Sequence, residues 1–307
     1  MATTRQSIIR GPGAVTFGGV TFHDASGIVA EIDSATQDVP SSIAGKLDTI
    51  KTDQTGRVTL TPVGTLSEAL LAALFPAYVR TPVIGQSLFG TTDAPLAVLS
   101  RAGTKVTFNA AALTKCPDLI LSPVKTAFGQ AEFTALLANG KLPTETGSFY
   151  AVAAQTYNLG EPSRQGLSGN HYSAAFGTAL SIPDTLDGWT VGVELQTEPV
   201  TTDSQGTIDY TLTGVNVTAR CTPLGLSEAQ ILAALPALKG RGASLAGDDD
   251  LVISSDNGLT VTLKCASLVT GPLNWGATAL RAGEIGFTAN IDPSDGSLFD
   301  VEYTDPS

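Results

Sequence analysis

The sequence contains one segment twice, and this repeat constrains the fold more than any other feature. Residues 61–69, T-P-V-G-T-L-S-E-A, return one residue shorter at 222–229 as T-P-L-G-L-S-E-A. Each segment then runs through an Ala/Leu stretch to a proline, Pro76 in the first and Pro236 in the second. A long segment that recurs within one chain predicts two copies of a single structural unit.

Weaker matches extend the repeat, in the same order, over most of the chain. Residues 27–62 and 188–223 align without a gap, and the further matches pair 85–90 with 242–247, 103–108 with 258–263, 128–133 with 282–287 and 147–152 with 296–301. The segment 158–163, N-L-G-E-P-S, is typical of a linker. We therefore predict two tandem domains, residues 1–157 and 158–307, each large enough for its own core.

Composition excludes several classes of protein. With 42% hydrophobic and 15% charged residues, the 307-residue chain should be folded throughout. Its formal net charge of −12 argues against a nucleic-acid-binding surface, although such a chain could let DNA pass without holding it. No apolar run follows the first residues or approaches the length of a membrane span, so we expect a soluble protein made in the cytosol.

The residue types that carry chemistry are scattered. Cys116, Cys221 and Cys265 lack metal-ligand spacing and are expected to be buried, reduced thiols. His23, expected in a loop beside Asp24, has no G-x-S-x-G motif to accompany it. The acidic run 248–250 lacks the pattern of a calcium loop and is interpreted as a charged loop. We predict no enzyme activity, no cofactor and no metal site.

Strand signals dominate the local pattern. Residues 57–61, 105–109 and 260–264 alternate polar with β-branched or aromatic residues, as a sheet with one buried face requires. An Asn-Gly turn at 257–258 predicts a tight hairpin.

Each copy also predicts one short helix before its proline. The first begins with a capping box at Thr65-Leu66-Ser67-Glu68, and the second should start more weakly because Gly225 replaces Thr65. Helices of this length need a sheet to lie against, so the predicted fold is mainly β: a sandwich or barrel with one flanking helix per domain.

A long hairpin with a polar tip is predicted in each copy, between residues 29 and 59 and at the matching positions of the second copy. The first tip carries Ser41, Ser42 and Gly45, and the second carries Asp203, Ser204 and Gly206. A projecting arm of this kind is a common means of reaching a neighbouring subunit. These six residues are our candidate contact residues.

Taken together, these elements resemble the tail tube (major tail) proteins of long-tailed bacteriophages. The resemblance is carried by the Phe17-Gly18-Gly19 turn, the long hairpin with Gly45, the strand running into Thr-Pro-x-Gly with its Ala/Leu helix, and the late F-G-Q-A-E-F strand at 128–133. It covers both halves, most clearly residues 27–140 and 188–291, and rests on a pattern of elements and short motifs.

The resemblance implies a structural role in the virion tail, with assembly in the bacterial cytoplasm. Family members form stacked rings of six domains whose sheets join around a channel for DNA, and the hairpin contacts the next ring. A duplicated chain would close such a ring with three copies, giving pseudo-sixfold symmetry. Tape-measure and tail-terminator proteins would be further partners, and DNA would cross the acidic lumen without specific binding.

A second interpretation remains open. Tandem β-sandwiches also occur in surface, adhesion or decoration proteins that bind a host receptor or a carbohydrate. The absence of a signal-like segment, the 6% aromatic content and the short linker disfavour it.

Overall fold

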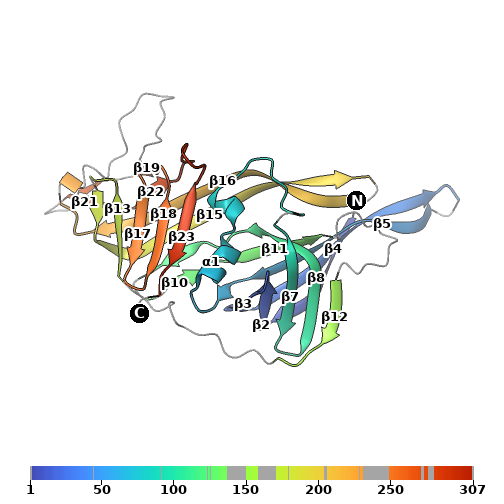
Figure 1. Ribbon diagram of the computed structural model, residues 1–307. Helices are drawn as coiled ribbons and strands as arrows, with labels where there is room; N and C mark the ends of the chain where they lie inside the picture. Colours follow the sequence, from blue (N-terminus) through green and yellow to red (C-terminus); the bar gives the residue numbers. More distant parts are fainter. Residues whose placement is uncertain are drawn as a thin grey trace.

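The structure, a computed structural model, describes residues 2–43, 45–90, 92–122, 124, 126–136, 150–157, 171–178, 180–203, 206–227, 229–230, 249–270, 273–275 and 280–305. It is mainly β, as predicted, with antiparallel sheets and two short helices in the described part (Figure 1).

The elements of the first half are β1 (Ala2–Gly11), β2 (Gly13–Phe17), β3 (Val20–Asp24), β4 (Ile28–Ser41), β5 (Gly45–Leu60), β6 (Pro62–Val63), α1 (Glu68–Leu74), α2 (Ala77–Arg80), β7 (Ala94–Ser100), β8 (Thr104–Lys115), β9 (Leu119–Leu121), β10 (Thr126–Phe128), β11 (Ala131–Leu136) and β12 (Tyr150–Ala154). Those of the second half are β13 (Tyr172–Phe176), β14 (Leu180–Ile182), β15 (Asp184–Thr202), β16 (Gly206–Leu224), β17 (Leu251–Ser255), β18 (Leu259–Leu263), β19 (Ser267–Thr270), β20 (Leu273–Trp275), β21 (Leu280–Ala282), β22 (Ile285–Thr288) and β23 (Phe299–Tyr303).

The first half folds as two layers joined by the long strand β8. One end of β8 pairs with β11, which continues into β5, β4 and β1. Its other end pairs with β7 and β12, and β7 continues into β2 and β3. Burial alternates along β8 and the inner end of β5, because one face of each layer is turned to the shared core. The predicted strands at 57–61 and 105–109 are therefore present.

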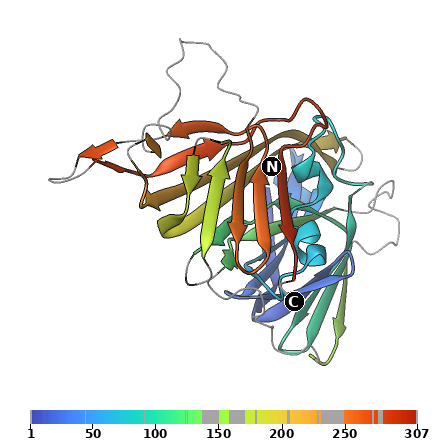
Figure 2. The ribbon, with the colours of Figure 1, turned by 60° about the vertical axis from the view of Figure 1, so that its left-hand side comes forward.

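Most of this pairing order recurs in the second half. The order β14-β13-β17-β18-β23 matches β3-β2-β7-β8-β12, and β15-β16-β22-β19 matches β4-β5-β11-β8 (Figure 2 shows the five-stranded sheet). The two layers are separate sheets here, because Lys264 to Ala266 interrupt the counterpart of β8 between β18 and β19. The division into two tandem copies stays a prediction. The predicted seam near residue 158 lies outside the described residues.

The helix caps differ from the prediction. Helix α1 begins after Ser67, not Thr65, and the Ser67 hydroxyl accepts a hydrogen bond from the Leu70 amide at 3.2 Å. In the second copy Ser227 and Gln230 cap each other, with the Ser227 amide 2.9 Å from the Gln230 side-chain oxygen. The expectation of an incomplete box there was wrong, because Ser227-x-x-Gln230 forms a box that begins two residues after Gly225.

One continuous core joins the two halves. Its largest fully buried side chains come from both, among them Phe22, Phe108, Phe133, Trp189 and Phe287. All three cysteines are buried and none forms a disulfide, as predicted. Burial raises the pKa of the Cys116 thiol far above its usual range, which keeps it protonated and unreactive.

Candidate assembly surfaces

A sheet runs without interruption from the first copy into the second. Strand β9 of the first copy pairs antiparallel with β15 of the second, so that β10-β9-β15-β16-β22-β19 forms one six-stranded sheet. The register places Leu121 opposite Trp189 and Leu119 opposite Val191, and all four side chains are buried. Strand addition of this kind is how separate units share one wall without exposed edges.

Close backbone approach fixes this joint at Gly188. The residue has a φ of +86°, and a Cβ at this position would lie 2.0 Å from the carbonyl oxygen of Leu121. A side chain therefore cannot be placed there without separating β9 from β15.

The helices of the first copy form a second joint, against the last strand of the second copy. Phe75 packs edge-on against Phe299, with ring centroids 5.6 Å apart. Arg80 forms an ion pair with Asp300 at 3.1 Å, and the Arg80 carbonyl accepts a hydrogen bond from the Leu298 amide at 2.7 Å. Figure 2 shows α1 and α2 beside β23. The predicted helix thus lies against a sheet, and that sheet includes a strand of the other copy.

A loop of the first copy makes a third joint, along β16. The Leu88 amide donates to the Tyr210 carbonyl at 2.9 Å, and the Leu212 amide donates to the Gln86 carbonyl at 2.9 Å. Backbone bonds of this kind extend the sheet edge by a short, irregular strand.

The two long hairpins lie side by side, and the second one is anchored on the first. The Thr207 hydroxyl donates a hydrogen bond to the Asp53 carboxylate at 2.7 Å. A Cβ on Gly206 would lie 2.6 Å from the same carboxylate and 2.9 Å from the Thr52 carbonyl oxygen. The end of the second hairpin, at Gly206 and Thr207, is therefore packed against the first hairpin.

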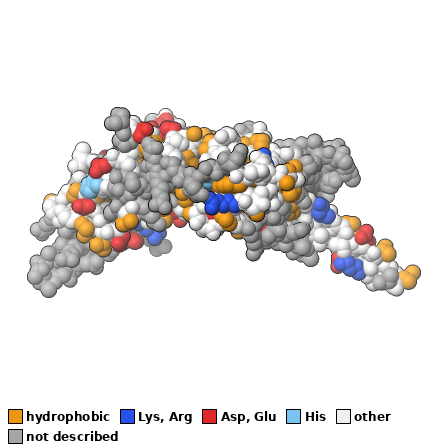
Figure 3. All heavy atoms as spheres, turned by 90° about the horizontal axis from the view of Figure 1, so that it is seen from below, with side chains coloured by type: hydrophobic (Ala, Val, Ile, Leu, Met, Phe, Trp, Pro, Cys, Tyr) orange, Lys and Arg blue, Asp and Glu red, His pale blue; other side chains and the backbone are white. Residues whose placement is uncertain are grey.

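The first tip extends beyond this contact and is uncovered. Residues 42, 43 and 45–51 are all exposed, and three of these side chains are large and apolar: Ile43 (98% exposed), Leu47 (67%) and Ile50 (46%). Figure 3 shows the arm projecting from the body with hydrophobic atoms at its end. Lys46 pairs with Asp38 across the hairpin at 2.6 Å, and this hydrogen bond lowers the pKa of Asp38. We call Ile43, Leu47 and Ile50 the arm patch.

The predicted contact residues fall at these tips. Ser41, Ser42 and Gly45 lie at the end of the first arm, Asp203 and Gly206 at the end of the second, and Ser204 outside the described residues. Sequence reasoning missed the arm patch because it weighed only the polar residues of the tip. The usable signal was the presence of Ile43, Leu47 and Ile50 in a hairpin end that is otherwise polar.

A hollow of about 490 Å³ lies beside the joint between β9 and β15. Lys115, Cys116 and Asp118, which lead into β9, form one side, and Gly192 to Leu195 of β15 form the other. It occupies the stretch of the β15 edge next to the three residues that pair with β9.

The residues weighed for chemistry have structural partners. His23 lies in strand β3, not in a loop as expected, and its Nδ1 is 3.2 Å from the Tyr157 hydroxyl. Its neighbour Asp24 accepts a hydrogen bond from the Thr61 amide at 2.8 Å. The described residues contain no group of three or more His, Cys, Asp or Glu side chains arranged to hold a metal ion.

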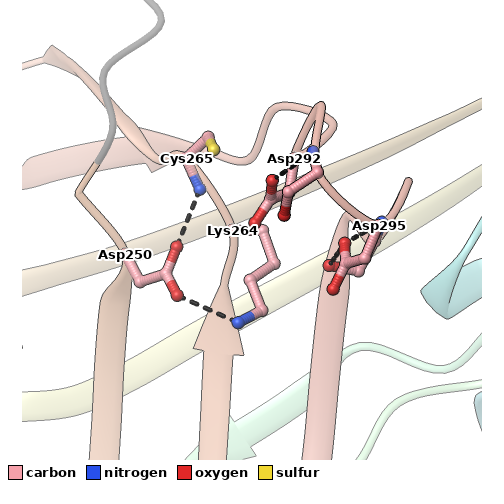
Figure 4. A network of polar contacts seen from close by, with 7 residues as sticks. Asp250, Lys264, Cys265, Asp292 and Asp295 are labelled. Atoms are coloured by element: carbon pink, nitrogen blue, oxygen red, sulfur yellow. Dashed lines mark hydrogen bonds and ion pairs between the residues drawn. The ribbon is translucent and has the colours of Figure 1, made fainter.

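The acidic run near residue 250 closes a turn (Figure 4). Asp250 accepts hydrogen bonds from the Cys265 amide and the Lys264 ammonium group, each at 3.0 Å. Lys264 also faces Asp292 and Asp295, and its pKa is raised, chiefly by the bond to Asp250. Asp248 lies outside the described residues.

Among the described residues, no helix is long and apolar enough to cross a membrane. The sequence matches no known family model, and no curated protein matches it.

Proposed function

We propose that this chain is the subunit of a bacteriophage tail tube, in which three copies form a ring of six similar domains and rings stack around a channel for DNA. The observation that carries the proposal is the pairing of β9 with β15, which joins the two copies into a common sheet. In a ring, the same contact between neighbouring units is repeated around an axis. The pairing of β9 with β15 is a contact of this kind between two similar units.

The arm patch supports stacking of the rings. An apolar group at the end of a projecting hairpin is costly in water and is typical of a surface that a partner covers. The partner in this proposal is the adjacent ring. The tape-measure and tail-terminator proteins would bind at the inside and the end of the tube, and the assembled tube would reside in the virion tail.

The net charge of −12 supports passage of DNA without specific binding. A wall rich in carboxylates repels phosphates, so the DNA would remain mobile in the lumen. Nothing in this role requires a bond-making step, and the proposed function is not enzymatic.

Electron microscopy of the purified protein at increasing concentration tests the proposal. We expect rings or tubes with a central hole, and a ring mass of three chains. Rings of six full chains would refute the stoichiometry, and monomers at all concentrations would refute the tube. Ligand-dependent stabilisation of such monomers by a carbohydrate or receptor fragment would favour the adhesion interpretation.

A further inference from the structure

Among the described strands, the second-copy counterpart of β9 has one free edge. The segment β9–β10 of the first copy corresponds to β20–β21 of the second, because each lies between the counterparts of β8 and β11 and each forms a short antiparallel pair. In the matched registers, Leu119 to Leu121 correspond to Leu273 to Trp275. Whereas β9 adds to a six-stranded sheet, β20 pairs with β21 alone among the described strands.

The strand that β20 would join can be identified from the same correspondence. Since residues 27–62 align with 188–223 without a gap, Ile28, Val29 and Ala30 of β4 correspond to Trp189, Thr190 and Val191 of β15. Those three residues of β15 are the ones that pair with β9. Within one molecule, β20–β21 and the β4–β5 hairpin lie toward opposite ends (Figure 1), as a head-to-tail contact between two copies requires.

The corresponding edge of β4 is already occupied by the chain's own first strand. Gly11, Arg10 and Ile9 of β1 lie opposite Ile28, Val29 and Ala30. They run antiparallel to β4 in the same register in which Leu121, Ile120 and Leu119 run along β15. One strand edge can pair with only one partner on that side, so β1 and an incoming β20 exclude each other over these three residues.

We propose that the end of β1 is a strand that protects the assembly edge, and that β20 of a second copy of this chain replaces it when the ring closes. The inference rests on the proposed function and specifies its interchain joint. In that joint Leu273, Asn274 and Trp275 of one chain pair with Ala30, Val29 and Ile28 of the next. Before a second chain binds, β1 covers the edge of β4, which could otherwise pair with strands of other molecules and cause aggregation.

The exposed strand β12 supports the same head-to-tail contact independently. It corresponds to β23, where Phe299 and Val301 are fully buried beneath the first-copy helices. The residue that matches Val301 is Val152, which is 53% exposed. In a head-to-tail ring, the neighbouring chain would cover Val152.

A disulfide lock tests the exchange directly. In the double variant Arg10→Cys/Val29→Cys the two cysteines face each other across β1 and β4, and either type of antiparallel pair brings Cα atoms within disulfide range. The oxidised variant should fail to form rings or tubes, and reduction should restore them. The matched control, Thr4→Cys/Ser34→Cys, ties β1 to β4 farther along and leaves the contested residues free, so it should assemble in both states.

A second variant detects the joint itself. Asn274→Cys/Val29→Cys should form disulfides between chains when assembled protein is oxidised, whereas Asn274→Cys/Asp33→Cys should not, because Asp33 lies about 13 Å farther along β4. Assembly of the oxidised lock at the unmodified rate, without this cross-link, would overturn the exchange and leave the tube intact. Failure of the unmodified chain to form rings under any condition would overturn the proposed function together with the exchange.

Discussion

The Thr207 hydroxyl donates a hydrogen bond of 2.7 Å to the Asp53 carboxylate, and this bond ties the second long hairpin to the middle of the first. A Cβ added to the neighbouring Gly206 would lie 2.6 Å from the same carboxylate. The two long hairpins therefore differ: the second packs against the first, and the end of the first is exposed.

Substitution of Gly206 should test this anchor. Gly206→Ala forces a side chain into a positive φ and against Asp53, and we expect it to lower the free energy of unfolding by about 2–3 kcal/mol. Gly45→Ala is the matched control, because Gly45 has a similar φ of +74° but no atom within 4 Å of the added Cβ. It should cost only about 1 kcal/mol, the conformational term. Urea unfolding of both variants measures the difference, and equal costs would contradict the anchor.

Substitutions at a second pair of glycines should distinguish an effect on stability from an effect on assembly. Gly188→Ala would place a Cβ 2.0 Å from the Leu121 carbonyl oxygen, so we expect severe destabilisation or failure to fold. At the corresponding Gly27 the nearest atoms are those of Gly11, 3.9 Å away, and Gly27→Ala should fold with a smaller loss.

The same Gly27→Ala variant should assemble poorly if β20 takes the place of β1, since β20 would approach Gly27 as β9 approaches Gly188. Thermal melting and sedimentation of the two variants give the two readouts. Normal assembly of a folded Gly27→Ala protein would contradict the proposed register.

The arm patch should matter for stacking and not for folding. Ile43 and Leu47 are exposed in the single chain, so Ile43→Ser/Leu47→Ser should change the free energy of unfolding by less than about 0.5 kcal/mol. We expect rings of normal mass but few or short tubes in electron micrographs. Val83→Ser, at a residue 59% exposed, is the control and should form tubes like the unmodified chain. Long tubes from the arm variant would exclude the patch as the inter-ring contact.

Lys264 should stabilise the fold in a pH-dependent manner. Because the bond to Asp250 raises the pKa of Lys264, its contribution is fully present below the ordinary value of 10.5 and disappears as pH rises through the folded-state pKa. Lys264→Met should cost about 1 kcal/mol at neutral pH, a modest value because the ion pair is partly solvated.

As pH rises from 10.5 through the raised folded-state pKa of Lys264, the free energies of unfolding of the Lys264→Met variant and the unmodified protein should therefore converge. Lys115→Met, at an exposed lysine, serves as the control. A constant difference across the whole pH range would show that packing, not charge, accounts for the loss.

The sequence was sufficient for the fold class because local signals and global pairing agree along most strands. Alternation at residues 57–61 and 260–264 marks strands whose buried faces the structure confirms, and both long hairpins turn where the polar tips predicted. The sequence pattern predicted the helix cap at Thr65, two residues before the observed cap, Ser67. Several hydroxyls near the start of a helix can accept hydrogen bonds from the same amides, so the exact cap is hard to predict.

The joints between the copies could not be predicted from the sequence. Residues 119–121 are too short to be distinguished from a loop, and their pairing with 189–191 depends on contacts far apart in the chain. The anchor of Thr207 on Asp53 is likewise a tertiary contact with no local pattern. The sequence does show that Ile43, Leu47 and Ile50 are apolar residues in a hairpin end that is otherwise polar. Hydrophobic periodicity alone does not show that they face solvent.

The unequal hairpins have a consequence for how a tube would be aligned. A ring of identical domains could sit on the next ring in as many rotational settings as it has domains, all equal in energy. If only the first-copy arm carries an apolar end, every second setting leaves that end against a domain of the other type. Duplication followed by divergence would thus halve the rotational settings available to each new ring, and the three side chains of one hairpin would determine the twist of the whole filament.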